Sequence, residues 1–118
     1  MRRISAKDVA QPLQMRLVQH QDTVVLVASG EIDIVHADRL RRRLLELVES
    51  FRRVVLDLRE VEFIDSTGLH CVLDVDAASQ AAGVEFTLIR GPARVQRLFE
   101  LTGTDDRFRF VDGVDGFG

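Results

Sequence analysis

The residues best suited to chemistry are the run Asp65-Ser66-Thr67-Gly68, which combines a carboxylate, two hydroxyls and a glycine. Asp and Ser are preferred where a helix begins, because their side-chain oxygens accept hydrogen bonds from amides that have no partner inside the helix. An ordinary helix start, capped by Asp65 or Ser66, is one interpretation. The other is a phosphorylation switch at Ser66, since a phosphate there would lie beside free N–H groups and the positive end of the helix dipole. Both interpretations can hold for the same serine.

The familiar catalytic patterns are missing from the sequence. The one lysine, Lys7, follows no glycine-rich turn, which excludes a Walker-type phosphate loop, and no three glycines have the spacing of a dinucleotide fingerprint. A serine hydrolase needs a glycine two residues before its nucleophile, whereas Ile64 stands there before Ser66. A receiver domain phosphorylated at Asp57 would need an acidic pair for magnesium and a later lysine. We therefore expect a protein that is not an enzyme and uses no cofactor.

The candidate metal ligands are scattered along the chain. The sequence holds three histidines and one cysteine, Cys71, and only His70 and Cys71 are adjacent, which puts them on different faces of a helix. We expect no metal site, and we expect Cys71 to be a small buried hydrophobic residue. A single cysteine also excludes an intramolecular disulfide.

Length and charge limit the remaining classes of function. The chain has 118 residues, the length of one ordinary domain. Its 16 basic and 19 acidic residues give a net charge of −3, which argues against direct binding to nucleic acid. Its longest apolar run, Val24–Ala28, is far shorter than the roughly 20 residues of a membrane-spanning helix. Polar residues follow Arg2 and Arg3, where a signal peptide would be apolar. We expect a cytoplasmic protein without membrane insertion.

Hydrophobic periodicity predicts the elements that must position Ser66. Apolar residues alternate or run together in five segments, and recur at spacings of three and four in three others. An α/β fold follows: a mixed four- to five-stranded sheet with three helices packed on it. Strands are expected at 13–18, 23–28, 54–58, 84–89 and 108–111, and Val61–Ile64 is expected to approach the 65–68 run in extended form. Ser29 and Gly30 are expected to end the second strand, and Glu31-Ile32-Asp33 to lead into a loop. Helices are expected from about His36 to Phe51, from the 65–68 run to Gly83, and from Pro92 to Gly103. The domain spans 12–111, between a mobile lead-in (1–11) and a flexible Gly/Asp-rich tail (112–118).

Four segments, in order and at matching intervals, resemble the STAS domain proteins of the bacterial anti-sigma factor antagonist group. The resemblance runs from about Leu13 to Val111. Its carriers are Gly30-Glu31-Ile32-Asp33, Val54-Val55-Leu56-Asp57-Leu58, Phe63-Ile64-Asp65-Ser66-Thr67-Gly68-Leu69 and Val95-Gln96-Arg97-Leu98-Phe99-Glu100-Leu101-Thr102-Gly103.

The resemblance implies a partner-switching mechanism of the kind used in sporulation and stress responses. The unphosphorylated domain would bind an anti-sigma factor, often itself a serine kinase, and so free a sigma factor. That kinase would phosphorylate the serine after the motif's aspartate, here Ser66, with Thr67 the secondary candidate, and a serine phosphatase would reset the switch. The residues expected at the partner-binding surface are Glu31, Asp33, Asp65, Ser66, Thr67, Gly68, Leu69 and Arg94.

Three alternatives stay open. STAS proteins of a second kind are structural subunits that bind the ATPase of lipid-transport complexes without phosphorylation, and these generally have threonine in place of this serine.

The basic run Arg41-Arg42-Arg43, with Arg52 and Arg53, is either a solvated face or a docking patch for an acidic partner. Family members usually continue into a final helix, whereas here a Gly-rich stretch follows Val111. We therefore expect an exposed apolar patch, and a monomer or weak homodimer.

Overall fold

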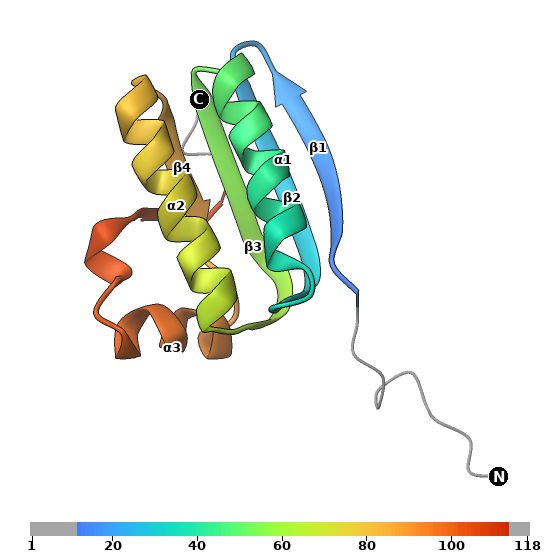
Figure 1. Cartoon of the computed structure of the whole chain (residues 1–118), viewed down its shortest axis with the longest axis vertical. Helices are drawn as coiled ribbons and strands as arrows, with labels where there is room; N and C mark the ends of the chain where they lie inside the picture. The colour runs from blue at the N-terminus through green and yellow to red at the C-terminus, as the bar shows by residue number, and fades with distance from the viewer. Residues whose placement is uncertain (1–11, 114–118) are drawn as a thin grey trace, which may run out of the picture.

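A computed structural model describes residues 12–113, so the expected lead-in (1–11) and most of the expected tail lie outside the described residues. One sheet contains five strands in the order β1-β2-β3-β4-β5, with β1 antiparallel to β2 and the other pairs parallel (Figure 1). The expected mixed sheet with three helices is confirmed. The strands are β1 (Gln14–His20), β2 (Thr23–Ile32), β3 (Arg53–Ile64), β4 (Glu85–Ile89) and β5 (Arg109–Val111). The helices are α1 (Ala37–Ser50), α2 (Ser66–Ala82) and α3 (Ala93–Leu101), with a short 3₁₀ turn, η2 (Asp105–Arg107).

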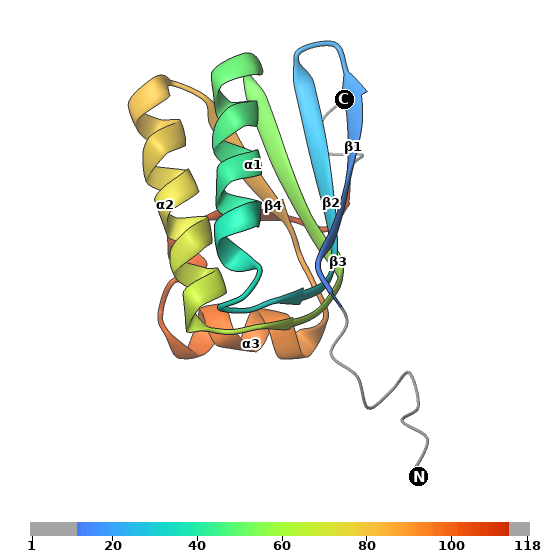
Figure 2. The same cartoon turned by 45° about the vertical axis from the view of Figure 1, so that its right-hand side comes forward.

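The helices lie on one side of the sheet. α1 and α2 run side by side across it, and α3 lies beneath the end where β3 finishes and α2 begins (Figures 1 and 2). The main core fills the space between these helices and the sheet, with fully buried leucines from both layers such as Leu40, Leu44 and Leu56. α2 ends where the sequence predicts, because Gly83 takes the left-handed backbone conformation (φ 72°) that favours glycine.

β2 and β3 are longer than the apolar runs predict. β2 does not end at Ser29 and Gly30 but continues to Ile32, and β3 is one strand through Ile64. The pairing shifts register between Val27 and Ser29 and again after Gly30, whose φ of 89° fits an irregularity in the strand. The apolar run ends there although the backbone pairing continues. As a result β2 and β3 finish side by side, at Ile32 and Ile64.

A second, smaller apolar cluster lies on the other face of the sheet. It consists of Val25, Val27, Val55 and Ile89, each at most 9% exposed, with Val111 packed against it. In the described part of the chain no helix follows β5. The exposed apolar patch expected on that account is not found at this cluster, because its side chains are buried.

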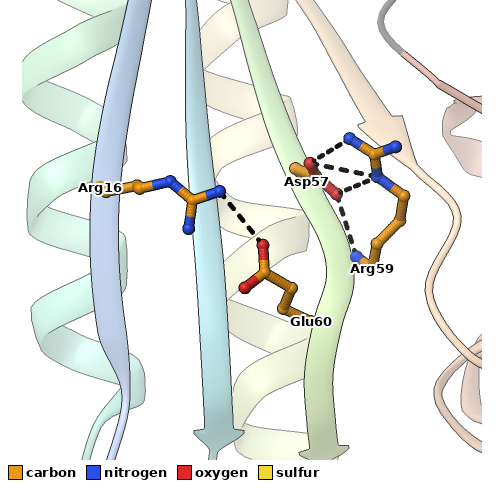
Figure 3. Close-up of polar contacts among 4 residues, drawn as sticks. All are labelled: Arg16, Asp57, Arg59 and Glu60. Atoms are coloured by element: carbon orange, nitrogen blue, oxygen red, sulfur yellow. Dashed lines mark hydrogen bonds and ion pairs between the residues drawn. The ribbon is translucent and has the colours of Figure 1, made fainter.

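Polar side chains share this second face, the one turned away from the helices in Figure 3. Asp57 in β3 is buried and accepts hydrogen bonds from Arg59, with 2.8 Å between Oδ2 and the guanidinium NH2 group. The carboxylate raises the pKa of Arg59 through this hydrogen bond. An exposed ion pair of 3.3 Å joins Arg16 in β1 to Glu60 in β3 (Figure 3). Asp57 therefore forms an ion pair with an arginine of its own strand.

The basic run on α1 is balanced by the chain's own carboxylates. Arg41 and Arg42 both pair with Asp38, and Arg43 pairs with Glu46. Such pairs at helical spacing are typical of a solvated helix face. The second interpretation of this run, a docking patch for an acidic partner, has less free positive charge to support it.

Candidate functional site

The site forms where β2 and β3 end, because two parallel strands deliver their following loops to the same edge of the sheet. The amide of Asp65 donates to the carbonyl oxygen of Ile32 at 3.2 Å, which joins the start of α2 to the end of β2. The loop that begins at Asp33 therefore lies next to Ser66. Two of the segments that carry the family resemblance, 30–33 and 63–69, therefore meet at this edge although they lie about 30 residues apart in the sequence.

Asp65 caps α2. Its backbone is extended, and its Oδ1 atom accepts a hydrogen bond from the amide of Gly68 at 3.0 Å. Of the two caps that the sequence allows, the structure uses the aspartate, so Ser66 becomes the first residue of the helix. Ser66 is exposed, and within residues 12–113 its hydroxyl has no hydrogen-bond partner. The amides of Ser66 and Thr67 are likewise without acceptors in this region, as expected for the first turn of a helix.

Gly68 permits the close approach of α2 to the strand ends. A Cβ atom at this position would lie 2.6 Å from the carbonyl oxygen of Ile32 and 2.8 Å from side-chain carbons of both Ile32 and Ile64. These distances are shorter than any real Cβ contact, so only glycine fits without displacement. Gly68 is buried, and its contribution is to the position of the helix start.

The neighbouring residues of α2 divide between surface and core. Thr67 is half-buried and His70 is exposed, whereas Leu69, expected at the partner surface, is only 3% exposed and packs in the main core. Leu69 therefore lies beneath the surface and supports it. Cys71 is buried as expected, and burial raises the pKa of its thiol to about 12, which makes it an inert packing residue.

Asp33 organises the loop between β2 and α1. Its Oδ1 atom accepts hydrogen bonds from the amides of Val35 and His36, each at 3.1 Å, and lies 2.7 Å from Nδ1 of His36. Partial burial alone would raise the pKa of Asp33, but the hydrogen bonds and the charge of His36 hold it below its ordinary value of 3.8. The role that the structure gives to Asp33 is therefore turn formation, with its carboxylate already engaged. Glu31 is half-buried near the end of β2 and also has an interaction within the protein.

Arg94 reaches the site from α3. Its Nε atom donates to the backbone carbonyl oxygen of Glu62 at 2.6 Å. This hydrogen bond joins the start of α3 to the last residues of β3 before the site. The residue is exposed. Arg94 thus holds two elements together and also places a positive charge at this edge.

Three exposed apolar residues of the site were not predicted from the sequence. Ile34 is 73% exposed, Val35 76% and Phe63 47%, and all three lie within three residues of the Asp65–Ile32 hydrogen bond along the chain. The available signal was an apolar pair, Ile34-Val35, inside a predicted loop, where turn-forming polar residues are usual. Their exposure distinguishes this edge from an ordinary helix start.

The groups at the site are a hydroxyl, free amides and a few engaged polar side chains. Among residues 12–113, no three His, Cys, Asp or Glu side chains gather in a way that could hold a metal ion. The histidine at the site, His36, is engaged with Asp33 and not with Ser66. No helix in the described region is long and apolar enough to cross a membrane. What the site offers is one exposed hydroxyl beside free amides, at the same edge of the sheet as the exposed apolar residues Ile34, Val35 and Phe63.

Comparison with known proteins gives consistent matches over most of the chain. The STAS domain family model matches residues 14–116. An anti-sigma-B factor antagonist of Bacillus subtilis is 31% identical over 88 residues, which make up 75% of this chain and 81% of that protein. The anti-sigma-F factor antagonist RsfB of Mycobacterium tuberculosis is 30% identical over 98 residues, 82% of this chain and 80% of that protein. The crystal structure of an anti-sigma factor antagonist from Mycobacterium paratuberculosis has a TM-score of 0.77 at 28% identity, covering 92% of this chain and 94% of that one.

Proposed function

Since the chain belongs to the STAS domain family, with relatives named as anti-sigma factor antagonists along most of its length, we propose that it is an anti-sigma factor antagonist controlled by phosphorylation at Ser66. Its unphosphorylated form binds an anti-sigma factor with serine kinase activity and so releases a sigma factor. Phosphorylation of Ser66 by that kinase ends the interaction, and a serine phosphatase restores it. The protein acts by binding, not as an enzyme, and its place of action is the cytoplasm.

The observation that carries the proposal is the free hydroxyl of Ser66 at the first position of α2. Because Asp65 provides the cap, Ser66 can change its chemistry without removing a hydrogen bond that the helix needs. The amides of Ser66 and Thr67 have no acceptors in the described region, so phosphate oxygens could accept from them. The helix dipole also favours an anion at this end. The folded domain would therefore tolerate the modification while its surface changes.

A phosphate would oppose partner binding chiefly through its hydration. It adds about −1.5 to −2 charges and three strong acceptors at neutral pH. A buried interface at Ser66 would have to strip water from this group, and burying a charge without full compensation is costly. The unmodified serine carries only a small hydroxyl. The two states thus differ most at the one position that a docked partner would cover.

The kinase assay tests the site. The purified protein is incubated with radiolabelled ATP and each kinase-type anti-sigma factor encoded in the same genome. We expect one phosphate per chain with at least one of them, no incorporation in Ser66→Ala, and retained incorporation in Thr67→Ala, the matched control one residue away. Undiminished labelling of Ser66→Ala would refute the assignment of the site.

A binding assay tests the function itself. Isothermal titration should show binding of the same anti-sigma factor to the unphosphorylated protein and at least tenfold weaker binding after phosphorylation. Size-exclusion chromatography of the protein alone should show a monomer or a weak homodimer. If affinity purification from the native cell recovers a transporter ATPase and no anti-sigma factor, the protein is instead a structural subunit of a lipid-transport complex.

A further inference from the structure

Exposed apolar residues concentrate at the edge of the fold that carries Ser66. Within the described chain, six large apolar side chains are exposed, and three of them, Ile34, Val35 and Phe63, belong to the ends of β2 and β3. The other three are spread over β1 and α3. Single exposed apolar residues are common on protein surfaces, but a group at one edge marks an interaction site. This group is therefore the feature that the proposed phosphorylation site leaves unexplained.

The fold holds this group in a fixed arrangement. Ile34 and Val35 lie in the turn that the Asp33 carboxylate closes through the amides of Val35 and His36. Phe63 is in β3, paired with Glu31 of β2. The hydrogen bond from Asp65 to Ile32 joins both segments to the start of α2. A surface already ordered in this way loses little conformational entropy when a partner binds.

Acidic residues surround the group. Residues 30–38 and 60–69 together contain six carboxylates and no lysine or arginine. Asp38 and Glu60 pair with arginines of α1 and β1, and Asp33 is engaged by His36. Among the described residues Glu62 and Asp65 form no ion pair, and the guanidinium of Arg94 near them binds the backbone carbonyl of Glu62. The edge is thus apolar at its centre and acidic at its rim.

We infer that Ile34, Val35 and Phe63 form the apolar centre of the surface that binds the anti-sigma factor, and that the partner presents an apolar patch with a basic rim. This inference rests on the proposed function and adds the chemistry of the contact. Apolar residues at the centre of an interface supply most of its affinity, whereas rim charges set orientation and salt dependence. Ser66 adjoins this centre through Asp65.

An apolar centre next to the phosphorylation site also explains why a phosphate releases the partner. A basic rim would attract the added negative charge, so like-charge repulsion is not the cause of dissociation. The cause is dehydration of the phosphate against apolar side chains. Salt screens interactions between exposed charges, with a Debye length of about 10 Å at 0.1 M, but does not remove the cost of dehydration. The loss of affinity on phosphorylation should therefore persist at high salt.

Truncation of the apolar centre is the first test. The titrant is the anti-sigma factor that phosphorylates Ser66 in the kinase assay. Ile34→Ala, Val35→Ala and Phe63→Ala should each raise its Kd, by about tenfold for at least one of them, a typical effect for a central interface residue. Val18→Ala is the matched control: Val18 is also exposed, but it pairs with Val25, seven residues and roughly 23 Å from the end of β2. That variant should bind within twofold of wild type.

The salt series is the second test. From 0.05 to 0.5 M NaCl, the Kd of the unphosphorylated protein should rise, while the ratio of the phosphorylated to the unphosphorylated Kd should change less than threefold. If all three truncations bind within twofold of wild type while phosphorylation still releases the partner, the apolar centre is refuted and the proposed function stands. A ratio that falls toward one at high salt refutes dehydration as the cause. If no anti-sigma factor binds the wild-type protein, the proposed function is refuted, and the inference with it.

Discussion

Gly68→Ala tests whether the start of α2 depends on its close approach to the strand ends. At an open position inside a helix, replacing glycine by alanine stabilises by about 1 kcal/mol. Here the added Cβ atom would lie 2.6 Å from the carbonyl oxygen of Ile32, whereas ordinary van der Waals contact begins at 3.4 Å. The oxygen cannot simply retreat, because Ile32 is fully buried and paired with Ile64 in the sheet. The helix start must therefore move away from β2.

The expected cost follows from this displacement. Overpacking of a buried site costs about 1–3 kcal/mol, and weakening the Asp65–Ile32 hydrogen bond costs about 1 kcal/mol more. The gain in helix propensity offsets about 1 kcal/mol. We expect a net loss of about 2 kcal/mol in the free energy of unfolding. Because Ser66 moves with the helix start, its rate of phosphorylation by the cognate kinase should also fall.

Urea unfolding followed by far-UV circular dichroism measures this loss. The chain has no tryptophan or tyrosine, so intrinsic fluorescence is a poor probe. Gly113→Ala is the control, since a Cβ atom there would meet no other atom within 4 Å, and it should unfold within about 0.5 kcal/mol of wild type. If Gly68→Ala is as stable as wild type with an unchanged urea dependence, the close approach does not constrain this site and the reasoning is wrong.

Three further predictions concern charged and titratable groups. Asp33→Ala should destabilise by about 1 kcal/mol at pH 7 through loss of the turn hydrogen bonds. Because folding lowers the pKa of Asp33, its contribution is present above the ordinary value of 3.8 and is lost as the pH falls through the folded pKa, so the gap to wild type in unfolding should be the same at pH 7 and pH 5 and smaller at pH 3; an equal gap at all three would contradict this. Arg59→Met should cost about 2 kcal/mol by leaving the buried Asp57 carboxylate without its ion pair, and adding Asp57→Leu should recover part of the loss in the same urea assay, whereas additive losses would show that the pair is not coupled. Cys71 should resist iodoacetamide at pH 8 in the native protein and react in urea, since its thiol pKa is about 12; rapid native labelling seen by mass spectrometry would contradict its burial.

Much of the fold is predictable because it depends on local signals. The spacing of apolar residues gives the three helices, and Gly83 and Gly103 mark helix ends that the structure confirms with positive φ values. Asp65-Ser66-Thr67-Gly68 is a helix start in both sequence and structure, since caps act within four residues. Burial of Cys71 also follows from its position on an apolar helix face.

Predictions fail where pairing between distant segments decides the outcome. The apolar run stops at Ser29 and Gly30, yet β2 continues to Ile32, because β3 supplies hydrogen-bond partners across the register shifts. Leu69 is expected at the partner surface because it belongs to the same motif as Ser66, but its side chain packs in the main core. No local signal indicates that Arg94 binds the carbonyl of Glu62, since the two meet only when α3 folds beneath the sheet.

The sequence by itself determined the order of elements, the family and the serine at a helix start, because periodicity, capping and a short motif are properties of neighbouring residues. The tertiary structure decided which residue caps that helix, and so left the hydroxyl of Ser66 free. It also joined the end of β2, which the turn with Ile34 and Val35 follows, to the start of α2 through the hydrogen bond between Asp65 and Ile32. These features depend on parallel pairing of two strands whose ends lie 32 residues apart, a contact that no local pattern encodes.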